Sequence, residues 1–259
     1  MSSRKVKVNR WATTLTADLL NILNHAEDAK SANLSVKYTS PPWEIIYNKE
    51  RKPRPFVEAA VGVREMMLLQ PLSRQVFFQR FNYALPNYGK INSNALFKTS
   101  QITDMRMVIQ NDSKEMLLFY EEVLGLIQGR DDVETTFESY LAGREIFELQ
   151  SGEGFVVTAF DDPRSSKTDF QAARSGRLYI LRFPNSIALG DRFDRANPGC
   201  LGMSLYTYRV SSIAEYFQRV KASNAQTITE IVANEFGEQH FSFIAPDGYF
   251  WTFIESGLY

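Results

Sequence analysis

The chain has few of the residues from which metal sites and disulfides are usually built. Its 259 residues include one cysteine and two histidines. A single cysteine, Cys200, excludes a disulfide within the chain and any metal site made of several cysteines. His25 and His240 are too few for a multi-histidine metal centre. This cysteine usage fits a reducing environment, and we expect a cytoplasmic protein.

Long apolar runs and an excess of one charge are also missing. No stretch approaches the roughly 18 apolar residues of a membrane-spanning helix. No apolar segment typical of a signal peptide follows the basic residues near the start. The formal net charge is −1, so electrostatics would not draw the protein to nucleic acid or to an anionic membrane. We therefore expect neither a nucleic-acid nor a membrane partner.

What the chain does contain is a repeat of one order of elements: a strand, a helix and three strands. In the first copy, a strand at 105–109 precedes a helix that Asp112 caps and Gly125 ends. In the second, a strand at 205–210 precedes a helix capped by Ser212, with Glu215 in the capping-box position. The later strands are expected at 145–149, 155–160 and 178–183, and at 227–232, 240–244 and 249–254. Such a repeat predicts two copies of one βαβββ module.

The first 100 residues follow the same order more loosely. A helix is expected within 15–29, and strands at 43–47, 57–63 and 75–81, which together would make a degenerate third module. The stretch 85–100 is rich in Asn, Lys and Ser and is typical of a linker. The sequence therefore suggests an N-terminal region, 1–100, followed by a domain of two modules, 101–259.

Local motifs in both modules carry a resemblance to a known superfamily. The first helix runs through Phe119 and Tyr120 to Gly125, and the last strand follows the turn Pro246-Asp247-Gly248. This pattern resembles the vicinal oxygen chelate superfamily, which includes glyoxalases, extradiol dioxygenases, methylmalonyl-CoA epimerases and bleomycin-resistance proteins. The resemblance implies an α+β fold in which paired βαβββ modules form a cup-shaped mixed sheet. It implies a small-molecule ligand, and by analogy with the bleomycin-resistance proteins it implies a homodimer.

The positions that would hold the superfamily's metal carry unsuitable residues. Metal-dependent members have histidine or glutamate at the start of each module's first strand and glutamate in the last strand. Counting along the motifs places these positions at Met105, Leu205 and Thr252. Such side chains cannot replace the oxygen and imidazole ligands of a divalent cation. We expect no metal site and no cofactor, although a slip of one residue would bring Asp104 or Arg106 to the first position.

Alternation along the strands selects the residues expected to line the cup. Arg209 shares a strand face with Leu205 and Thr207 and would hold a carboxylate or an enolate oxygen. His240 has an ordinary pKa near neutrality and would move a proton. Each has a simpler interpretation, namely an arginine in a rim ion pair and a hydrogen-bonded histidine at a strand end. The expected substrate-binding residues are Met105, Met107, Leu205, Thr207, Phe250 and Thr252.

Three functions are compatible with these features. The first is a metal-independent lyase, isomerase or cyclase acting on a small apolar or aromatic carbonyl compound. The second is a non-catalytic protein that binds or sequesters a small molecule, as bleomycin-resistance proteins do. The third is a metal-dependent glyoxalase or extradiol dioxygenase, which requires a different strand register.

Overall fold

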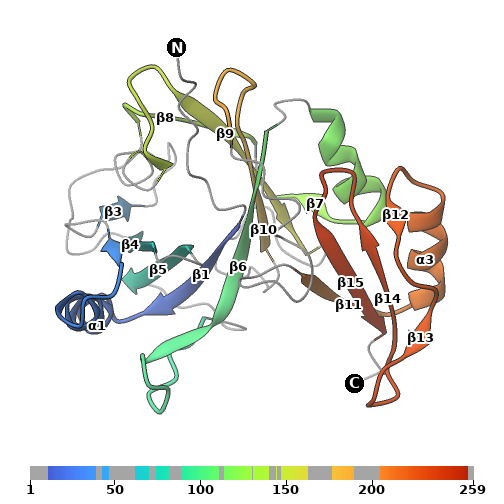
Figure 1. Cartoon of the computed structure of the whole chain (residues 1–259), viewed down its shortest axis with the longest axis horizontal. Helices are drawn as coiled ribbons and strands as arrows, with labels where there is room; N and C mark the ends of the chain where they lie inside the picture. The colour runs from blue at the N-terminus through green and yellow to red at the C-terminus, as the bar shows by residue number, and fades with distance from the viewer. Residues whose placement is uncertain are drawn as a thin grey trace. The chain divides into compact units, whose positions relative to one another are not determined.

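The computed structural model describes residues 11–38, 43–46, 62–69, 74–81, 89–110, 114–129, 131–139, 144, 147–162, 177–189 and 205–255. Three successive groups of elements follow one another along the chain (Figure 1). The first comprises β1 (Trp11–Ala17), α1 (Leu19–Ser31), β2 (Lys37–Tyr38), β3 (Trp43–Ile46), β4 (Gly62–Leu69) and β5 (Arg74–Phe81). The second comprises β6 (Thr99–Ile109), η1 (Lys114–Leu117), η2 (Phe119–Val123), β7 (Ile127–Gln128), β8 (Val133–Thr136), β9 (Gly154–Asp161) and β10 (Arg177–Arg182). The third comprises β11 (Tyr206–Val210), α3 (Ile213–Lys221), β12 (Gln226–Thr227), β13 (Val232–Ala233), β14 (Gln239–Ile244) and β15 (Phe250–Glu255).

Each group is a βαβββ module with the same strand pairing. The first strand of each module runs parallel to its last strand, so that β1 pairs with β5, β6 with β10 and β11 with β15. The last strand then pairs antiparallel with the strand before it. This topology confirms the expected α+β fold, and the N-terminal region forms a third module of the same kind.

The first two modules are joined into one sheet by their first strands. β1 and β6 pair antiparallel, and the resulting ten-stranded mixed sheet has the order β2-β4-β5-β1-β6-β10-β9-β7, with β3 on β4 and β8 on β9. The third module forms a separate five-stranded sheet, β11-β15-β14-β12, with β13 on β14. The sequence had suggested a pair made of the second and third modules. The sequence had also suggested a division at residue 100. In the structure β6 crosses that position and pairs with β1, so the two sides of residue 100 contribute to one sheet.

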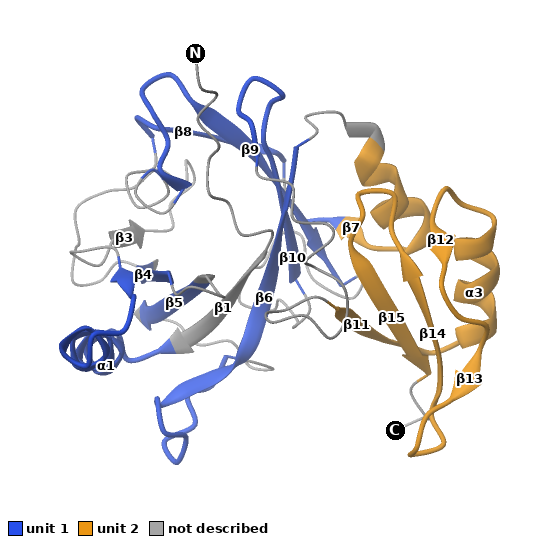
Figure 2. Ribbon diagram, in the orientation of Figure 1, with its two compact units in different colours: residues 1–112, 128–190 blue, residues 113–127, 191–259 orange. Residues whose placement is uncertain are grey.

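The chain divides into two compact units, shown in different colours in Figure 2. Unit 1 contains residues 1–112 and 128–190, and unit 2 contains residues 113–127 and 191–259. The helical segment η1–η2 of the second module therefore belongs to unit 2, whereas the strands β6, β8, β9 and β10 of that module belong to unit 1.

In unit 1, helix α1 identifies the outer face of the ten-stranded sheet. Asp18 caps this helix by accepting a hydrogen bond from the backbone N–H of Leu20 at 3.1 Å. Its buried residues pack on Met66, Leu68 and Phe77, which share one side of β4 and β5. The cup face of this sheet is therefore the opposite side, on which Met67 and Val76 lie.

In unit 2, a cluster of aromatic residues fills the space between the sheet and its helices. Trp251 and Phe253 are fully buried, as alternation along β15 predicts. Phe253 contacts Tyr216 of α3, and Trp251 contacts Tyr120 of η2. The Tyr120 hydroxyl also donates a hydrogen bond to Asp247, in the turn that precedes β15. The Asp-Gly turn thus anchors a helix as well as starting a strand.

The helix ends differ in part from the expected ones. Gly125 ends the second module's helix at φ +70°, and the N–H of Leu126 reaches back to the carbonyl of Tyr120 at 3.0 Å. At α3 the expected capping box is wrong, because the Ser212 side chain makes no capping bond. Glu255 instead accepts a hydrogen bond from the N–H of Ile213 at 3.2 Å, so a carboxylate from the last strand caps this helix. The expected cap Asp112 lies outside the described residues. Among the residues that the structure describes, no helix is long and apolar enough to cross a membrane.

Two of the expected strands are absent from the described part of the chain. Phe147 is helical, Glu148 lies in a turn and Leu149 is irregular, and the outer strands of the second module are β7 and β8 instead. The segment 227–232 contains β12 and β13 separated by irregular chain. A short apolar run does not specify a strand by itself: in the first segment its side chains pack into the core, whereas in the second Ile228 and Val232 are exposed. Phe147 and Leu149 are indeed buried in one core cluster.

A buried ion pair holds the connection after β7 against the outer face of unit 1. Arg182 Nη2 lies 2.7 Å from Asp132 Oδ2, and the Arg182 side chain is only 3% exposed. Asp132 also accepts hydrogen bonds from Thr158 at 2.7 Å and from Gln128 at 3.0 Å. The Asp132 carboxylate is therefore bonded on several sides within the fold.

Removing one partner of this pair should strongly destabilise the protein. We expect Asp132→Ala to lower the free energy of unfolding by about 3 kcal/mol, because it leaves the Arg182 charge buried without its carboxylate. Urea unfolding measures this change. The double variant Asp132→Leu/Arg182→Met should recover most of the loss, and a double variant as unstable as the single one would contradict the argument.

Candidate functional site

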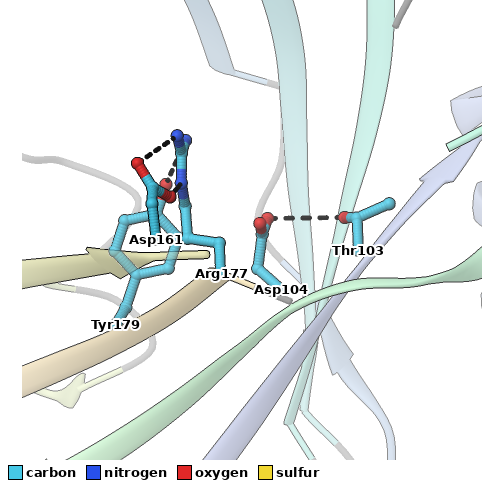
Figure 3. Close-up of polar contacts among 5 residues, drawn as sticks. All are labelled: Thr103, Asp104, Asp161, Arg177 and Tyr179. Atoms are coloured by element: carbon cyan, nitrogen blue, oxygen red, sulfur yellow. Dashed lines mark hydrogen bonds and ion pairs between the residues drawn. The ribbon is translucent and has the colours of Figure 1, made fainter. Parts of the chain in front are cut away.

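The cup face of unit 1 carries a group of charged and polar side chains, of which Figure 3 draws Asp104, Asp161, Arg177 and Tyr179. We call it the cup cluster: Asp104 and Arg106 of β6, Asp161 of β9, and Arg177 and Tyr179 of β10. In the pairing of β6 with β10, Arg177 lies opposite Asp104 and Tyr179 lies opposite Arg106. Directly paired residues point to the same side of a sheet, so strand register alone brings these groups together.

Arg177 and Asp161 form the centre of the cup cluster. Arg177 donates from Nε to Asp161 Oδ1 at 2.5 Å and from Nη2 to Oδ2 at 3.1 Å, a bidentate arrangement. Its Nη1 also donates to the Tyr179 hydroxyl at 3.3 Å. The Asp161 side chain is 5% exposed and the Arg177 side chain 25% exposed. Arg177 can therefore be reached by solvent or by a solute, whereas Asp161 is its buried counter-charge.

Asp104 lies next to this pair and has a perturbed acidity. Burial raises the pKa of the Asp104 carboxyl above its ordinary value, and the guanidinium groups of Arg177, Arg106 and Arg80 offset only part of that increase. Thr103 also donates a weak hydrogen bond to Asp104 at 3.4 Å. A buried carboxyl whose pKa is shifted toward neutrality is suited to both taking up and releasing a proton.

The surrounding arginines are held in place by separate contacts. The Arg106 guanidinium lies over the Tyr179 ring, 5.3 Å from its centroid. Arg80 donates to the carbonyl of Gly89 at 2.9 Å. A Cβ at Gly89 would lie 2.3 Å from the Arg80 side chain, so only glycine allows this approach. The positive charges around Asp104 are thus positioned by an aromatic ring and by backbone.

Gly129 provides the space that Asp161 occupies. It precedes β8, and its N–H donates to the carbonyl of Ala159 on β9 at 2.9 Å. A Cβ built on Gly129 would lie 1.9 Å from Oδ2 of Asp161. The position of the Asp161 carboxylate, and hence of Arg177, depends on glycine at this residue.

The carboxylates of the cup cluster do not suit a divalent cation. Among the described residues, no three histidine, cysteine, aspartate or glutamate side chains come together as a metal site. Arg177 holds both oxygens of Asp161, and three guanidinium groups act on Asp104. A cation brought to these oxygens would be repelled by that positive charge. The metal site of metal-dependent vicinal oxygen chelate proteins therefore does not fit these residues.

Met105 and Met107 do not share a face with the cup cluster. They alternate with Asp104 and Arg106 along β6 and pair with Leu178 and Ile180. Met107 is fully buried. The two methionines were expected to line the cup, but they belong to the outer side of the sheet. The observed register is the one-residue slip that places Asp104 and Arg106 on the cup face.

The other expected site residues lie in unit 2, on one face of its sheet. Thr207, Thr252 and Ser242 are paired across β11, β15 and β14, and Ser242 Oγ lies 2.7 Å from Thr252 Oγ1. Phe250 is buried on the same face of β15. Leu205 precedes β11 and is exposed. We call this side, opposite α3, the open face of unit 2.

Arg209 and His240 also lie on the open face, and both pair with Ile254. Arg209 is 54% exposed and donates to Glu238 at 2.8 Å. A hydrogen bond from Asn234, and then the Arg209 guanidinium, lowers the pKa of Glu238. Within the described residues, His240 Nδ1 is buried without a hydrogen-bond partner. Arg209 therefore has the simpler of its two expected environments, that of an arginine in an ion pair, and it shares a face with Thr207 and His240.

The sequence contains a local signal for part of the cup cluster. Asp104 and Arg106 are charged residues that alternate with Met105 and Met107. Such alternation marks one polar face. Arg177, Asp161 and Gly129 carried no comparable signal, because only strand pairing and close approach give them a role.

The close approach at Gly129 can be tested by a double-mutant cycle. We expect Gly129→Ala to lower the free energy of unfolding by about 1–3 kcal/mol, because the new methyl group displaces the Asp161 carboxylate. In an Asp161→Ala background the same change should cost much less. Urea unfolding of the four proteins measures the coupling, and additive effects would show that the two residues do not meet.

The raised pKa of Asp104 predicts a specific pH dependence of stability. The folded protein binds a proton at Asp104 more readily than the unfolded chain does. The contribution of this group to stability is therefore complete below its ordinary pKa and is lost as pH rises through the raised folded-state value. We expect the free energy of unfolding of the parent, relative to Asp104→Asn, to decrease over that range in urea titrations at several pH values. Parallel pH profiles would contradict it.

No protein-family model matches the chain, and no curated protein matches it significantly. Solved structures do match. A glyoxalase I variant from Zea mays aligns with 97% of this chain and 70% of its own length, at 12% identity and a TM-score of 0.50. A second maize variant gives the same TM-score and identity, with 69% of its length covered. A glyoxalase family protein from Bacillus cereus is 18% identical over 58% of this chain and 89% of its own, at a TM-score of 0.45.

At these identities the comparison concerns the fold and not the activity. The maize structures align with nearly the whole chain, across all three βαβββ modules. Together with the parallel pairing of first and last strands in each module, this likeness shows that the chain has the vicinal oxygen chelate fold of the glyoxalases.

Proposed function

We propose that this protein is a metal-independent enzyme that moves a proton on a small apolar or aromatic carbonyl compound, as an isomerase, lyase or cyclase would. The observation that supports it is Asp104, a buried carboxyl with a raised pKa among arginines on the cup face. Perturbed acids in such surroundings are typical of catalytic sites. The proposal places the chemistry in unit 1.

In the proposed reaction, the Asp104 carboxylate removes a proton from the carbon next to the substrate carbonyl. The electron pair of that C–H bond forms a C=C bond, and the carbonyl π electrons move to oxygen to give an enolate. The Arg106 guanidinium stabilises this negative oxygen. Asp104, now protonated, returns the proton to another atom of the same substrate, so that no oxidant or co-reactant is consumed.

Apolar residues on the same face provide a surface for the rest of the substrate. Val76 and Asp104 both pair with Thr14 of β1, so they flank one strand on the same side. Met67 and Val76 form a small apolar cluster to which Phe78 adds an aromatic ring. An apolar surface next to a charged group also strengthens electrostatic interactions at the reacting atoms.

Binding without conversion is the second candidate function. It is favoured by the pairing inside the cup cluster, where Arg177 already donates to both oxygens of Asp161 and to Tyr179. Such an arrangement can serve to recognise a ligand without chemistry. The fate of a bound molecule separates the two functions, since a binding protein returns it unchanged.

Arg209 and His240 form a second candidate site, which we keep as an alternative location for the same chemistry. Their common face in unit 2, with Thr207 and Thr252, supports it. There His240 would move the proton and Arg209 would hold the developing oxyanion. The exposure of Arg209 makes this site the weaker of the two, because charge acts less strongly in water.

Proton transfer can be detected without knowledge of the natural substrate. Small aromatic and aliphatic ketones and α-hydroxy carbonyl compounds are incubated with the protein in D2O, and exchange at the carbon next to the carbonyl is followed by NMR. We expect the parent to catalyse exchange of at least one compound, and Asp104→Asn to lose about 100-fold or more of that rate.

Three further variants locate the chemistry. Arg106→Ala should reduce exchange, and Arg106→Lys should restore part of it, because lysine keeps the charge without the planar fork. Arg209→Ala should leave exchange unchanged. Loss of exchange in Arg209→Ala, with Asp104→Asn active, would move the site to unit 2, and binding without exchange would favour sequestration.

A further inference from the structure

The loop before β6 exposes several large apolar side chains. We call residues 89–98 the β6 loop, and Figure 1 shows it projecting at the start of that strand. Within the loop, Ile91, Leu96 and Phe97 are 43%, 79% and 48% exposed. Single exposed apolar residues are ordinary in soluble proteins, but a group of them in one place marks a surface that contacts something.

Hydrogen bonds within the β6 loop fix its shape. The N–H of Asn92 donates to the carbonyl of Thr99 at 3.1 Å, and the N–H of Ala95 donates to the carbonyl of Asn92 at 3.1 Å. The Asn92 side chain also accepts a hydrogen bond from the N–H of Asn94 at 3.0 Å. Because the loop is ordered in advance, binding through it costs little additional conformational entropy.

Contacts with α1 hold the loop from the side. The carbonyl of Phe97 accepts a hydrogen bond from Nδ2 of Asn21 at 2.8 Å, and the Phe97 ring meets the His25 ring edge-on, with centroids 4.9 Å apart. Leu20, next to Asn21, is 66% exposed. The Asp18 carboxylate is engaged as the cap of this helix. The exposed apolar group therefore combines the β6 loop with the first turn of α1.

The charge around the β6 loop is of one sign. Residues 66–103 contain no aspartate or glutamate, and Lys90 and Lys98 of the loop are both exposed. The expectation of no membrane partner rested on the net charge of −1, which averages over the whole chain. Exposed apolar side chains next to lysines are the features that attach a protein to an anionic lipid surface.

We propose that the β6 loop binds unit 1 reversibly to an anionic lipid surface. Leu96 and Phe97 enter the headgroup layer, and Lys90 and Lys98 lie next to the acidic headgroups. Such attachment needs only a few apolar side chains and neighbouring cations, whereas a stable protein interface buries about 800 Å² on each partner. A single projecting loop therefore favours the lipid surface. This inference does not depend on the chemistry proposed for the cup.

The chain contains a matched control for this loop in unit 2. Phe236 is 79% exposed, the same fraction as Leu96, and it also lies in a turn. Its charged neighbours along the chain are carboxylates, Glu235 and Glu238. The two turns thus expose a similar apolar side chain, one beside cations and the other beside anions.

Cosedimentation of the purified full chain with lipid vesicles tests the proposal. We expect binding to phosphatidylcholine vesicles that contain about 30% phosphatidylserine, weak binding without that anionic lipid, and a decrease as salt screens the charges. Lys90→Gln/Lys98→Gln should reduce the partition coefficient about tenfold or more. Leu96→Ser should reduce it about fivefold or more, because less apolar surface leaves water. Phe236→Ser should have no effect.

Tryptophan introduced at the two turns reports insertion directly. Leu96→Trp should bind the anionic vesicles more tightly than the parent, and brominated acyl chains should quench its added fluorescence, because tryptophan favours the membrane interface. Tryptophan fluorescence added by Phe236→Trp should not be quenched. Circular dichroism verifies that each variant keeps the fold. A parent that ignores the anionic vesicles would overturn the proposal, as would binding that Leu96→Ser and Phe236→Ser affect equally.

Discussion

The antiparallel pairing of β1 with β6 is the contact on which the rest of this structure depends. It joins two βαβββ modules into one mixed sheet and makes the side opposite α1 a common cup face. On that face, residues from β6, β9 and β10 meet because their strands are in register. The same pairing uses the first strands of two modules, and it leaves the third module with a sheet of its own.

The charged side chains on the cup face neutralise one another. Isolated buried charges are costly, so Asp161 is matched by Arg177, and Asp104 lies among three guanidinium groups. Glycine at 129 leaves the room that this packing needs. The balance is incomplete at Asp104, where desolvation outweighs the arginines. The proton transfer proposed for the cup face depends on this residual imbalance, because a carboxyl with a raised pKa can both take up and release a proton.

The repeat, the module order and most strands could be read from the sequence, because they follow from local patterns. Alternation along the last strand accounts for the burial of Trp251 and Phe253. The glycine stop signal correctly marked Gly125 as a helix end. The errors arose where a distant segment decided the outcome. α3 is capped by Glu255, more than forty residues away, so the local Ser212 signal was misleading. The Asp112 cap lies outside the described residues, and so does all but the end of the strand expected at 57–63, whose last two residues begin β4.

The sequence by itself determined that the chain is built from βαβββ modules and that a conventional cysteine or histidine metal centre is excluded. It also determined that Thr207 and Arg209 share a face, since alternation is a local property of a strand; the pairing of β11 with β15 then places Thr252 beside Thr207. Only the tertiary structure decided which modules pair and which side of β6 faces the cup. A shift of one residue exchanges Met105 for Asp104, and that choice is made by partner strands that no local pattern specifies.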